Sequence, residues 1–496
     1  IGQDSPDEIY AALAKVSADD VNRVLRTYIQ PSHEIAMLLQ PKNVRALARP
    51  SANALAENVQ ITTDREEPLP GWAVPYFSAP LKAPTGDGAV ATFRLKNGIR
   101  LTVRNEALSP TIFLDGSIRT SPELYEPAHK EGVAHIAEVL LGWGTQTYDR
   151  KAFQAQLDAA AVAASLGTTF SLRSQSKNFD TALQLLSDGM LHPAFPQQAF
   201  EVVKNDEAKA LGAVEGLPRT QAQIAQMKAL YPYGDPRRRY ATRASVSQVS
   251  IADVRKWYTF AYRPDLTTIA IVGDVTPAQA RAAVEKYFGA WTATGKKPSF
   301  RFPKLKASSK SSVTVASPSS TQSQVTLTQV LDVHRTDPDY IPLQLANTIL
   351  SGEGIGSMLF RHLRESKGYV YNVSSSMDIG NSSSTFSIDF ASDPKNVNAA
   401  QAAAVADVKR LQTTLIPLAE LQRAKALLLA ERILPLDSYE GIADDILESA
   451  RIGESRLDEA VFWQALLQTT PQQLRSAMRR WVKADRFTRV ILAPGS

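Results

Sequence analysis

A helix–turn–strand unit occurs three times in this chain, at residues 16–41, 249–273 and 469–495. Each copy opens with a hydroxyl side chain followed three residues later by an acid or an amide, the pattern of a capping box at a helix start. Apolar residues then recur at helical spacing, and a polar turn leads into a short apolar run that suits a buried strand. The three capping pairs are Ser17 and Asp20, Ser250 and Asp253, and Thr470 and Gln473. The repetition predicts related domains that each end in a helix and a strand.

These units also predict the domain boundaries, because a chain of 496 residues is too long for one compact core. Residues 1–45 are expected to be the tail, a helix plus a strand, of a domain whose body lies upstream. Two complete domains are expected at 91–295 and 323–496, which are ordinary sizes for single domains. The segments 46–90 and 296–322 are rich in Pro, Ala, Ser or Lys and are expected to be linkers.

Local patterns within the two full domains indicate both strands and helices. Residues 93–103 alternate around Asn97 and Gly98, which predicts a β-hairpin with a type I′ turn. We therefore expect an α+β fold: two homologous domains, each a mainly antiparallel sheet covered by helices, preceded by the tail of a third such domain. Helices are expected at 151–164, 179–190, 197–213, 340–350 and 357–363, and strands within 313–331 and 369–389.

Composition excludes several classes of protein. The chain is 44% hydrophobic and 21% charged, as in soluble globular proteins, and no apolar stretch approaches the roughly 18 residues of a membrane span. The absence of cysteine excludes disulfides, thiolate metal sites and a cysteine nucleophile. The net charge of +5 is spread along the chain, and the Arg237–Arg239 cluster lacks interleaved aromatic residues. We expect that cluster to be solvated surface, and we do not expect nucleic-acid binding.

A candidate metal motif occurs at residues 132–145, which read GVAHIAEVLLGWGT. This segment resembles the inverzincin signature of the pitrilysin/insulinase-type zinc metallopeptidases, in which H-x-x-E-H lies inside a helix. The chemistry needs both histidines, because side chains at positions i and i+4 hold zinc from one helix face while the Glu between them polarises water. Here His135 and Glu138 are present, but Val139 occupies the position of the second histidine and has no lone pair to offer.

The resemblance implies a third ligand, a Glu on a helix some seventy to eighty residues downstream. Alignment of residues 200–216 places Ala210 at that position, with Glu207 and Glu215 nearby but out of phase. The other five histidines stand in no metal-ligand spacing with a second histidine. We therefore predict no metal in this chain, and we expect His135 and Glu138 to be relics that are hydrogen-bonded locally or line a cleft.

A second family motif lies at residues 351–371, which read SGEGIGSMLFRHLRESKGYVY. It is similar to the C-terminal motif of the same family, where an Arg and a Tyr seven residues apart project into the catalytic chamber. Arg364 and Tyr371 match that spacing. The resemblance implies that Arg364 binds a substrate carbonyl and that Tyr371 steadies the peptide and the developing oxyanion. Arg361 and Tyr369 are the alternatives if the register differs.

A plainer interpretation of this segment remains. An isolated Arg and Tyr at this spacing are ordinarily a surface salt-bridge donor and a packed strand aromatic. The Gly-rich run lacks the Lys-Ser/Thr of a phosphate loop, so nucleotide binding is not expected.

The resemblance implies that this chain is the substrate-binding half of a zinc metallopeptidase that hydrolyses peptides in a clamshell chamber. It is expected to be inactive alone and to work with a zinc-bearing N-terminal half that has an intact H-x-x-E-H, from the same precursor. No cofactor is expected in this chain, and zinc is expected in the partner half. The alternative is a non-catalytic structural or scaffold subunit; a stand-alone peptide-binding protein is disfavoured by the orphan tail at 1–45. The periplasm is the expected location, with the cytoplasm as the alternative.

Overall fold

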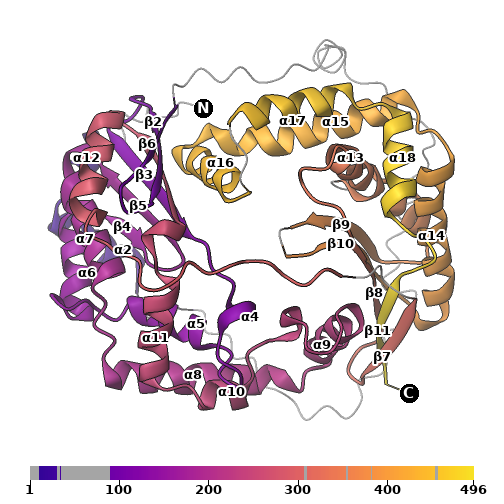
Figure 1. Cartoon of the computed structure of the whole chain (residues 1–496), viewed down its shortest axis with the longest axis horizontal. Coiled ribbons are helices and arrows are strands. Elements are labelled where there is room, and N and C mark those ends of the chain that lie inside the picture. Colours follow the sequence, from indigo (N-terminus) through magenta and orange to yellow (C-terminus); the bar gives the residue numbers. More distant parts are fainter. Residues whose placement is uncertain are drawn as a thin grey trace. The chain divides into compact units, whose positions relative to one another are not determined.

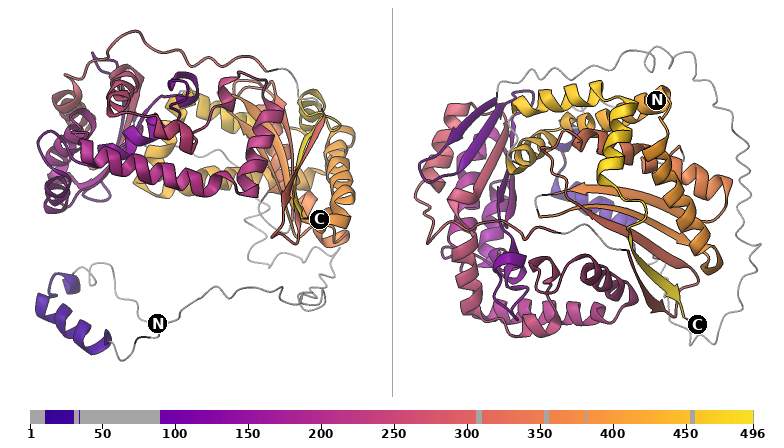
Figure 2. Two further views of the ribbon diagram at one scale, coloured as in Figure 1. Left: turned by 90° about the horizontal axis from the view of Figure 1, so that it is seen from below. Right: turned by 45° about the vertical axis from the view of Figure 1, so that its right-hand side comes forward.

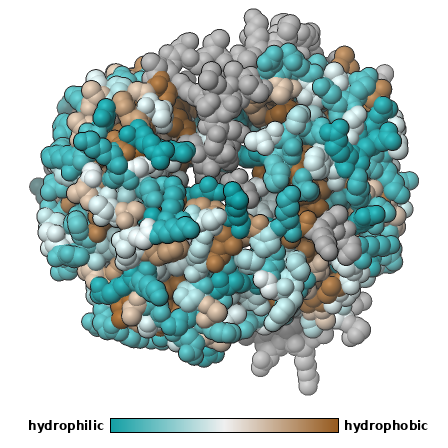
Figure 3. All heavy atoms as spheres, in the orientation of Figure 1, coloured by the Kyte–Doolittle hydropathy of each residue, from teal (hydrophilic) through white to brown (hydrophobic). Residues whose placement is uncertain are grey.

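The computed structural model describes residues 11–30, 34, 90–305, 310–352, 356–380, 382–452 and 456–495. The chain forms two compact units, residues 1–68 and residues 69–496. Within the described part of the chain, no helix is long and apolar enough to cross a membrane. The face of the molecule seen in Figure 3 is covered mainly by hydrophilic side chains, with apolar ones in small groups.

The first unit contains helix α2 (Ala18–Tyr28), drawn in indigo in Figure 2. Its predicted capping box is present, because Ser17 Oγ accepts a hydrogen bond from the Asp20 amide and the Asp20 carboxylate accepts one from the Ser17 amide. The apolar side chains of Val24 and Tyr28 are exposed. The strand predicted to follow this helix lies outside the described residues.

The second unit begins with a six-stranded sheet in the order β1-β2-β6-β3-β5-β4 (Figure 1). All neighbouring strands are antiparallel except β2 and β6, which run parallel. The parallel pair arises because β6 comes from the closing unit of this region and inserts between β2 and β3. The strands are β1 (Val90–Arg94), β2 (Arg100–Asn105), β3 (Thr111–Ile118), β4 (Ala163–Ser165), β5 (Thr169–Gln175) and β6 (Thr267–Gly273).

The predicted hairpin forms between β1 and β2, but its predicted turn type is wrong. A type I′ turn needs positive φ at both central residues, and only Gly98 has it, with φ of 101°. The amide of Gly98 donates to the Leu95 carbonyl at 3.0 Å, and the amide of Leu95 donates to the Ile99 carbonyl at 2.9 Å. This is a longer loop with glycine at the bulge position, where a Cβ would lie 2.9 Å from the backbone of Asp265.

Helices cover this first sheet and share its hydrophobic core. In Figure 1, α6, α7 and α12 lie on one side of the sheet. Two short helices, α4 (Pro122–Tyr125) and α10 (Arg243–Ser247), lie in the connections. The long helices are α5 (Val133–Leu141), α6 (Arg150–Ala159), α7 (Phe179–Leu191), α8 (Gln197–Glu215), α9 (Pro218–Leu230), α11 (Ile251–Ala261) and α12 (Pro277–Phe288).

A second sheet has five strands in the order β7-β11-β8-β10-β9. Strand β7 lies within the segment 296–322 that was expected to be a linker, so that expectation is wrong for Ser311–Ser317. The strands are β7 (Ser311–Ser317), β8 (Ser323–Leu331), β9 (Asn372–Ile379), β10 (Ser384–Ser392) and β11 (Thr488–Pro494). The helices of this part are α13 (Tyr340–Ser351), α14 (Val397–Thr413), α15 (Leu418–Ile433), α16 (Tyr439–Ile452), α17 (Arg456–Gln468) and α18 (Pro471–Trp481).

The closing units of the two sheets have the same topology. Helices α11 and α18 both begin at the predicted capping boxes. The strand that follows each, β6 or β11, pairs parallel to one neighbour and antiparallel to the other. The α+β prediction of two related, mainly antiparallel sheets covered by helices is therefore confirmed.

Two helices are exchanged between the sheets. Helix α9 follows the first sheet's helices in sequence but packs against β7 and β11 of the second sheet. Its Gln226 amide donates to Thr328 Oγ1 at 2.7 Å. Helix α16 belongs to the second region but packs against β3 and β6 of the first sheet (Figure 1), where Ile442 and Leu447 join a cluster with Val272. Each sheet is thus completed by a helix from the other region.

The prediction that the arginine cluster 237–239 is solvated surface is wrong for two of its members. The Arg237 side chain is buried and pairs with Asp235 at 2.8 Å. It also donates to the carbonyls of Pro303 and Ser382, both through Nη2, at 2.9 and 2.6 Å. Arg239 pairs with Glu131 at 3.0 Å and donates to backbone carbonyls. The guanidinium groups of Arg237 and Arg239 therefore link separate segments by hydrogen bonds, because each has several fixed N–H groups that can reach different carbonyls.

Candidate functional site

The degenerate metal motif lies on helix α5, with Ile136 and Leu140 buried in the core. This burial leaves His135 and Val139 on the accessible side, where Val139 is 38% exposed. The helix start is fixed by Glu126, whose Oε1 accepts hydrogen bonds from the amides of residues 132 and 134, each at 2.9 Å. Burial raises the pKa of the Glu126 carboxyl.

Helix α8 brings a carboxylate to this motif. His135 Nε2 lies 3.4 Å from Glu207 Oε2. The prediction that Glu207 is out of phase, with Ala210 at the third-ligand position, is therefore wrong. A signal was present in the sequence, because Glu207 lies 72 residues after His135, inside the expected interval.

The side chains at the motif do not fit a zinc ion. Catalytic zinc takes three protein ligands, whereas only His135 and Glu207 approach each other here, and Val139 contributes no donor atom. Glu138 instead accepts a hydrogen bond from Thr168 Oγ1 at 3.2 Å. Among the residues that the structure describes, no group of three His, Asp or Glu side chains is placed to hold a metal. No catalytic step through zinc is derived for this chain.

The motif lines an open cleft of about 940 Å³ between α5, α6 and the edge strand β4. His135, Glu138 and Val139 lie on one wall, and Arg150 and Leu166 contribute to others. An open cleft therefore lies beside a motif that supplies only one of the two histidines of the family signature.

The second motif forms a π-helical segment, η5 (Phe360–Ser366), a conformation that is rare and often marks functional sites. Two side chains anchor this segment to the helices behind it. His362 Nδ1 lies 2.9 Å from the carboxylate of Asp407 on α14, and Arg361 pairs with Glu420 on α15 at 3.0 Å. Burial raises the pKa of Asp407, and the adjacent imidazole partly offsets that effect. Residues 353–355 of the Gly-rich turn before this segment lie outside the described residues.

Arg364 and Tyr371 lie side by side at the end of this segment. The guanidinium carbon of Arg364 is 5.7 Å from the centroid of the Tyr371 ring, within cation–π range. Arg364 Nη1 donates to the Val370 carbonyl at 3.2 Å, and Gly368, with φ of 62°, lets the chain reverse between the two residues.

The Tyr371 phenol is accessible and keeps its proton. The residue is 46% exposed, and its hydroxyl donates to Asp393 Oδ1 at 2.9 Å. This hydrogen bond raises the pKa of Tyr371 above its usual value, so the group remains a donor at neutral pH. Arg361 and Tyr369, the alternatives to Arg364 and Tyr371, have structural partners. Arg361 pairs with Glu420, and Tyr369 packs against the hydrophobic core of the second sheet. A half-buried guanidinium beside an exposed phenol can bind a peptide carbonyl.

Comparison with known proteins connects both motifs to one family. The family model described as "Insulinase (Peptidase family M16)" matches residues 123–234, which include the degenerate motif. The family model described as "Peptidase M16 inactive domain" matches residues 248–428, which include η5. The two matched segments together span more than half of the chain. The two related sheets, each covered by helices, form a pair of domains with the fold of M16 peptidase domains. The chain belongs to the insulinase-type M16 peptidase family.

Individual relatives are distant in sequence. The "uncharacterized zinc protease YmxG" of Bacillus subtilis is 24% identical over 299 residues, covering 57% of this chain and 69% of that protein. The mitochondrial-processing peptidase subunit alpha of Rattus norvegicus is 22% identical over 441 residues, covering 83% of this chain and 82% of the relative.

Solved structures of similar fold include an M16 inactive domain from Pseudomonas fluorescens, with a TM-score of 0.73 and 21% identity. That match covers 82% of this chain and 98% of the other. The periplasmic protease PqqL from Escherichia coli has a TM-score of 0.71 and 18% identity. There, 98% of this chain aligns with only 52% of PqqL.

Proposed function

We propose that this chain is the substrate-binding half of a zinc metallopeptidase that hydrolyses peptides and is inactive without a zinc-bearing N-terminal half. The observation that carries the proposal is the Arg364–Tyr371 pair in a chain whose own motif lacks the second histidine, where Val139 stands. The alignment with about half of PqqL supports a half-molecule, and the similarity to a relative named as a subunit supports work with a partner.

In this proposal Arg364 binds a backbone carbonyl of the peptide, and its contact with the Tyr371 ring orients the guanidinium. Tyr371 donates a hydrogen bond to the oxygen on which negative charge develops, in place of its present hydrogen bond to Asp393. The partner half supplies zinc and the activated water. The similarity to PqqL, a periplasmic protease, also supports the periplasm as the proposed location.

The test is cleavage of a fluorogenic peptide by this chain alone and mixed with a zinc-bearing half that contains H-x-x-E-H. We expect activity only in the mixture. Arg364→Ala is expected mainly to raise KM, and Tyr371→Phe to lower kcat by about 10²–10³-fold, the usual effect of losing one oxyanion donor. Lys367→Ala, an exposed cation on the same turn, serves as the matched control and is expected to leave both constants unchanged.

A scaffold subunit is the second candidate, and the match to an "inactive domain" description favours it. Undiminished activity of both Arg364→Ala and Tyr371→Phe in the mixture would establish that alternative. Zinc content and peptide cleavage in the isolated chain would overturn both.

A further inference from the structure

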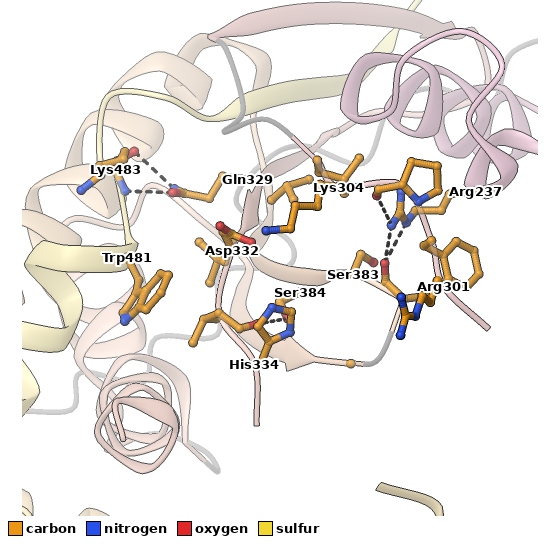
Figure 4. A pocket seen from close by; sticks show the side chains of 18 of the residues that line it. Arg237, Arg301, Lys304, Gln329, Asp332, His334, Ser383, Ser384, Trp481 and Lys483 are labelled. Atoms are coloured by element: carbon orange, nitrogen blue, oxygen red, sulfur yellow. Dashed lines mark hydrogen bonds between the residues drawn. The ribbon is translucent and has the colours of Figure 1, made fainter. Parts of the chain in front are cut away.

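A pocket of about 610 Å³ lies where five segments of residues 69–496 meet (Figure 4). Its walls come from Arg237 in the connection after α9, the segment after α12, the end of β8 and the residues after it, the turn between β9 and β10, and the end of α18 with the residues that follow it. The volume falls within the range of small-ligand sites. Neither Arg364 nor Tyr371 lines it, so it is distinct from the site proposed above.

Buried polar side chains fix the walls of this pocket. Gln329, only 2% exposed, accepts a hydrogen bond from the Lys483 amide at 2.8 Å and donates to the Lys483 carbonyl at 3.3 Å. Ser384, 3% exposed, donates to the Val333 carbonyl at 2.6 Å. The Arg237 hydrogen bonds described above join two further walls, as the dashed lines in Figure 4 show. The pocket is therefore preformed, which lowers the entropic cost of filling it.

The lining carries more positive charge than its surroundings neutralise. One carboxylate, Asp332, lines the pocket beside six cationic side chains. Two of the six are neutralised by ion pairs. Arg237 pairs with Asp235, as described above, and Arg480 pairs with Asp339, which does not line the pocket, at 2.7 Å. The cations are Arg237, Arg301, Lys304, Arg480, Lys483 and Arg486.

Three of these cations have no ion pair with any residue that the structure describes: Arg301, Lys304 and Arg486. Lys483 uses its ammonium group on the last carbonyls of α18. The uncompensated charge makes the pocket attractive to an anion.

The same pocket has apolar walls. Phe302, Leu331 and Trp481 line it, and the Trp481 ring stands at one end in Figure 4. A small inorganic anion makes no use of such surface, whereas an anion attached to an apolar group buries it.

We propose that this pocket binds the last residues of a peptide, with the C-terminal carboxylate held by Lys304 and Arg486, a large apolar terminal side chain against Trp481, and the residue before it also in contact with the pocket. In a chain of a peptidase family, a peptide end is the ligand that combines a carboxylate with an apolar group. Binding here requires neither a zinc-bearing partner nor the Arg364–Tyr371 pair, so its test is independent of the proposed function.

The first measurement is isothermal titration of the chain alone with acetyl-Ala-Ala-Phe as the free acid and as the C-terminal amide. We expect the acid to bind about tenfold or more tightly than the amide, since a charge-assisted hydrogen bond is lost in the amide. Acetylphenylalanine separates the two sources of this chemistry: weaker binding supports a peptide end. Equal binding of acetylphenylalanine would overturn the peptide assignment in favour of small apolar acids.

The second measurement uses charge-removing variants of exposed side chains, which are expected to fold normally. Lys304→Gln and Arg486→Gln are each expected to weaken binding of the acid about five- to tenfold. Lys409→Gln, an exposed cation on α14, is the matched control, and Arg364→Ala tests independence from the other site; both should bind normally. Equal affinity for acid and amide, unchanged binding in both pocket variants, or no binding of either peptide would each overturn the proposal.

Discussion

At the scale of single residues, one side chain separates this motif from a metal site. Helix α5 presents His135 to Glu207, so two of the three positions that a zinc ion needs are already near each other. Val139 lies one turn further along the same exposed face and ends in methyl groups. The predicted absence of zinc binding therefore depends on a missing lone pair and not on a collapsed site, because the neighbouring cleft is open.

Val139→His is therefore expected to create a zinc site by supplying the second histidine of the motif. Positions i and i+4 share one helix face, so the new imidazole joins His135 and Glu207. Metal content after dialysis against micromolar zinc, and displacement of a chromogenic chelator, measure the effect. Val202→His, at an exposed position of α8, is the control and should bind no more zinc than the parent chain. Stoichiometric zinc in the parent chain would contradict the account of a degenerate motif.

At the scale of elements, the repeated helix–turn–strand units show that the same capping pattern starts helices that differ in how far they are buried. Helices α2, α11 and α18 all begin at a hydroxyl cap with a reciprocal hydrogen bond. Val254 and Trp257 of α11 are buried against the core, as are Leu474 and Met478 of α18. None of the residues of α2 is buried. The cap is therefore expected to contribute to the stability of the fold only where its helix buries side chains in a core, as α11 and α18 do.

Ser250→Ala is expected to destabilise the folded unit 69–496 by about 1 kcal/mol, the typical cost of a lost N-cap. Urea unfolding monitored by tryptophan fluorescence measures the change. Ser17→Ala removes the equivalent cap of α2 and is the matched control: it should leave that transition unchanged, because α2 lies in the other compact unit. An equal shift in both variants would show that α2 unfolds together with the rest of the chain.

At the scale of the whole unit 69–496, helix α16 brings Asp444 next to Asp115, a half-buried carboxyl on β3 of the first sheet. Burial, together with the hydrogen bond to Asp444 and its charge, raises the pKa of Asp115 on β3 to about 7. Glu440 on α16 adds to this effect and itself pairs with Arg173 on β5 at 2.9 Å. The contact between α16 and the first sheet is therefore expected to be sensitive to pH.

Because the folded state raises the pKa of Asp115 from 3.8 to about 7, the folded state binds a proton more tightly than the unfolded chain. The contribution of Asp115 to the free energy of unfolding is expected to be greatest below about pH 4 and to be lost as pH rises to about 7. The loss is about 1–2 kcal/mol, reduced by the partial exposure of the carboxyl. Asp115→Asn should flatten the profile from urea unfolding between pH 4 and 8, and Asp206→Asn, an exposed control, should not. A pH slope that persists in Asp115→Asn would show that another group carries it.

Much of the fold follows from sequence patterns. The capping pairs located the starts of α2, α11 and α18, and alternation located the hairpin of β1 and β2. Such patterns work because a helix or strand is decided by neighbours a few residues away and by the need to bury one face. The turn type was not predictable from Asn97 and Gly98 alone, because loop length depends on where the two strands begin to pair.

The candidate site divides in the same way. The sequence by itself determined that Val139 offers no metal ligand and that Arg364 and Tyr371 stand at the family spacing, because both are properties of residue identity and order. Only the tertiary structure decided that Glu207 faces His135, that Arg237 is buried, and that α9 and α16 complete each other's sheets. These are choices among partners far apart in the chain, and they depend on which surfaces fit together, which no local pattern encodes.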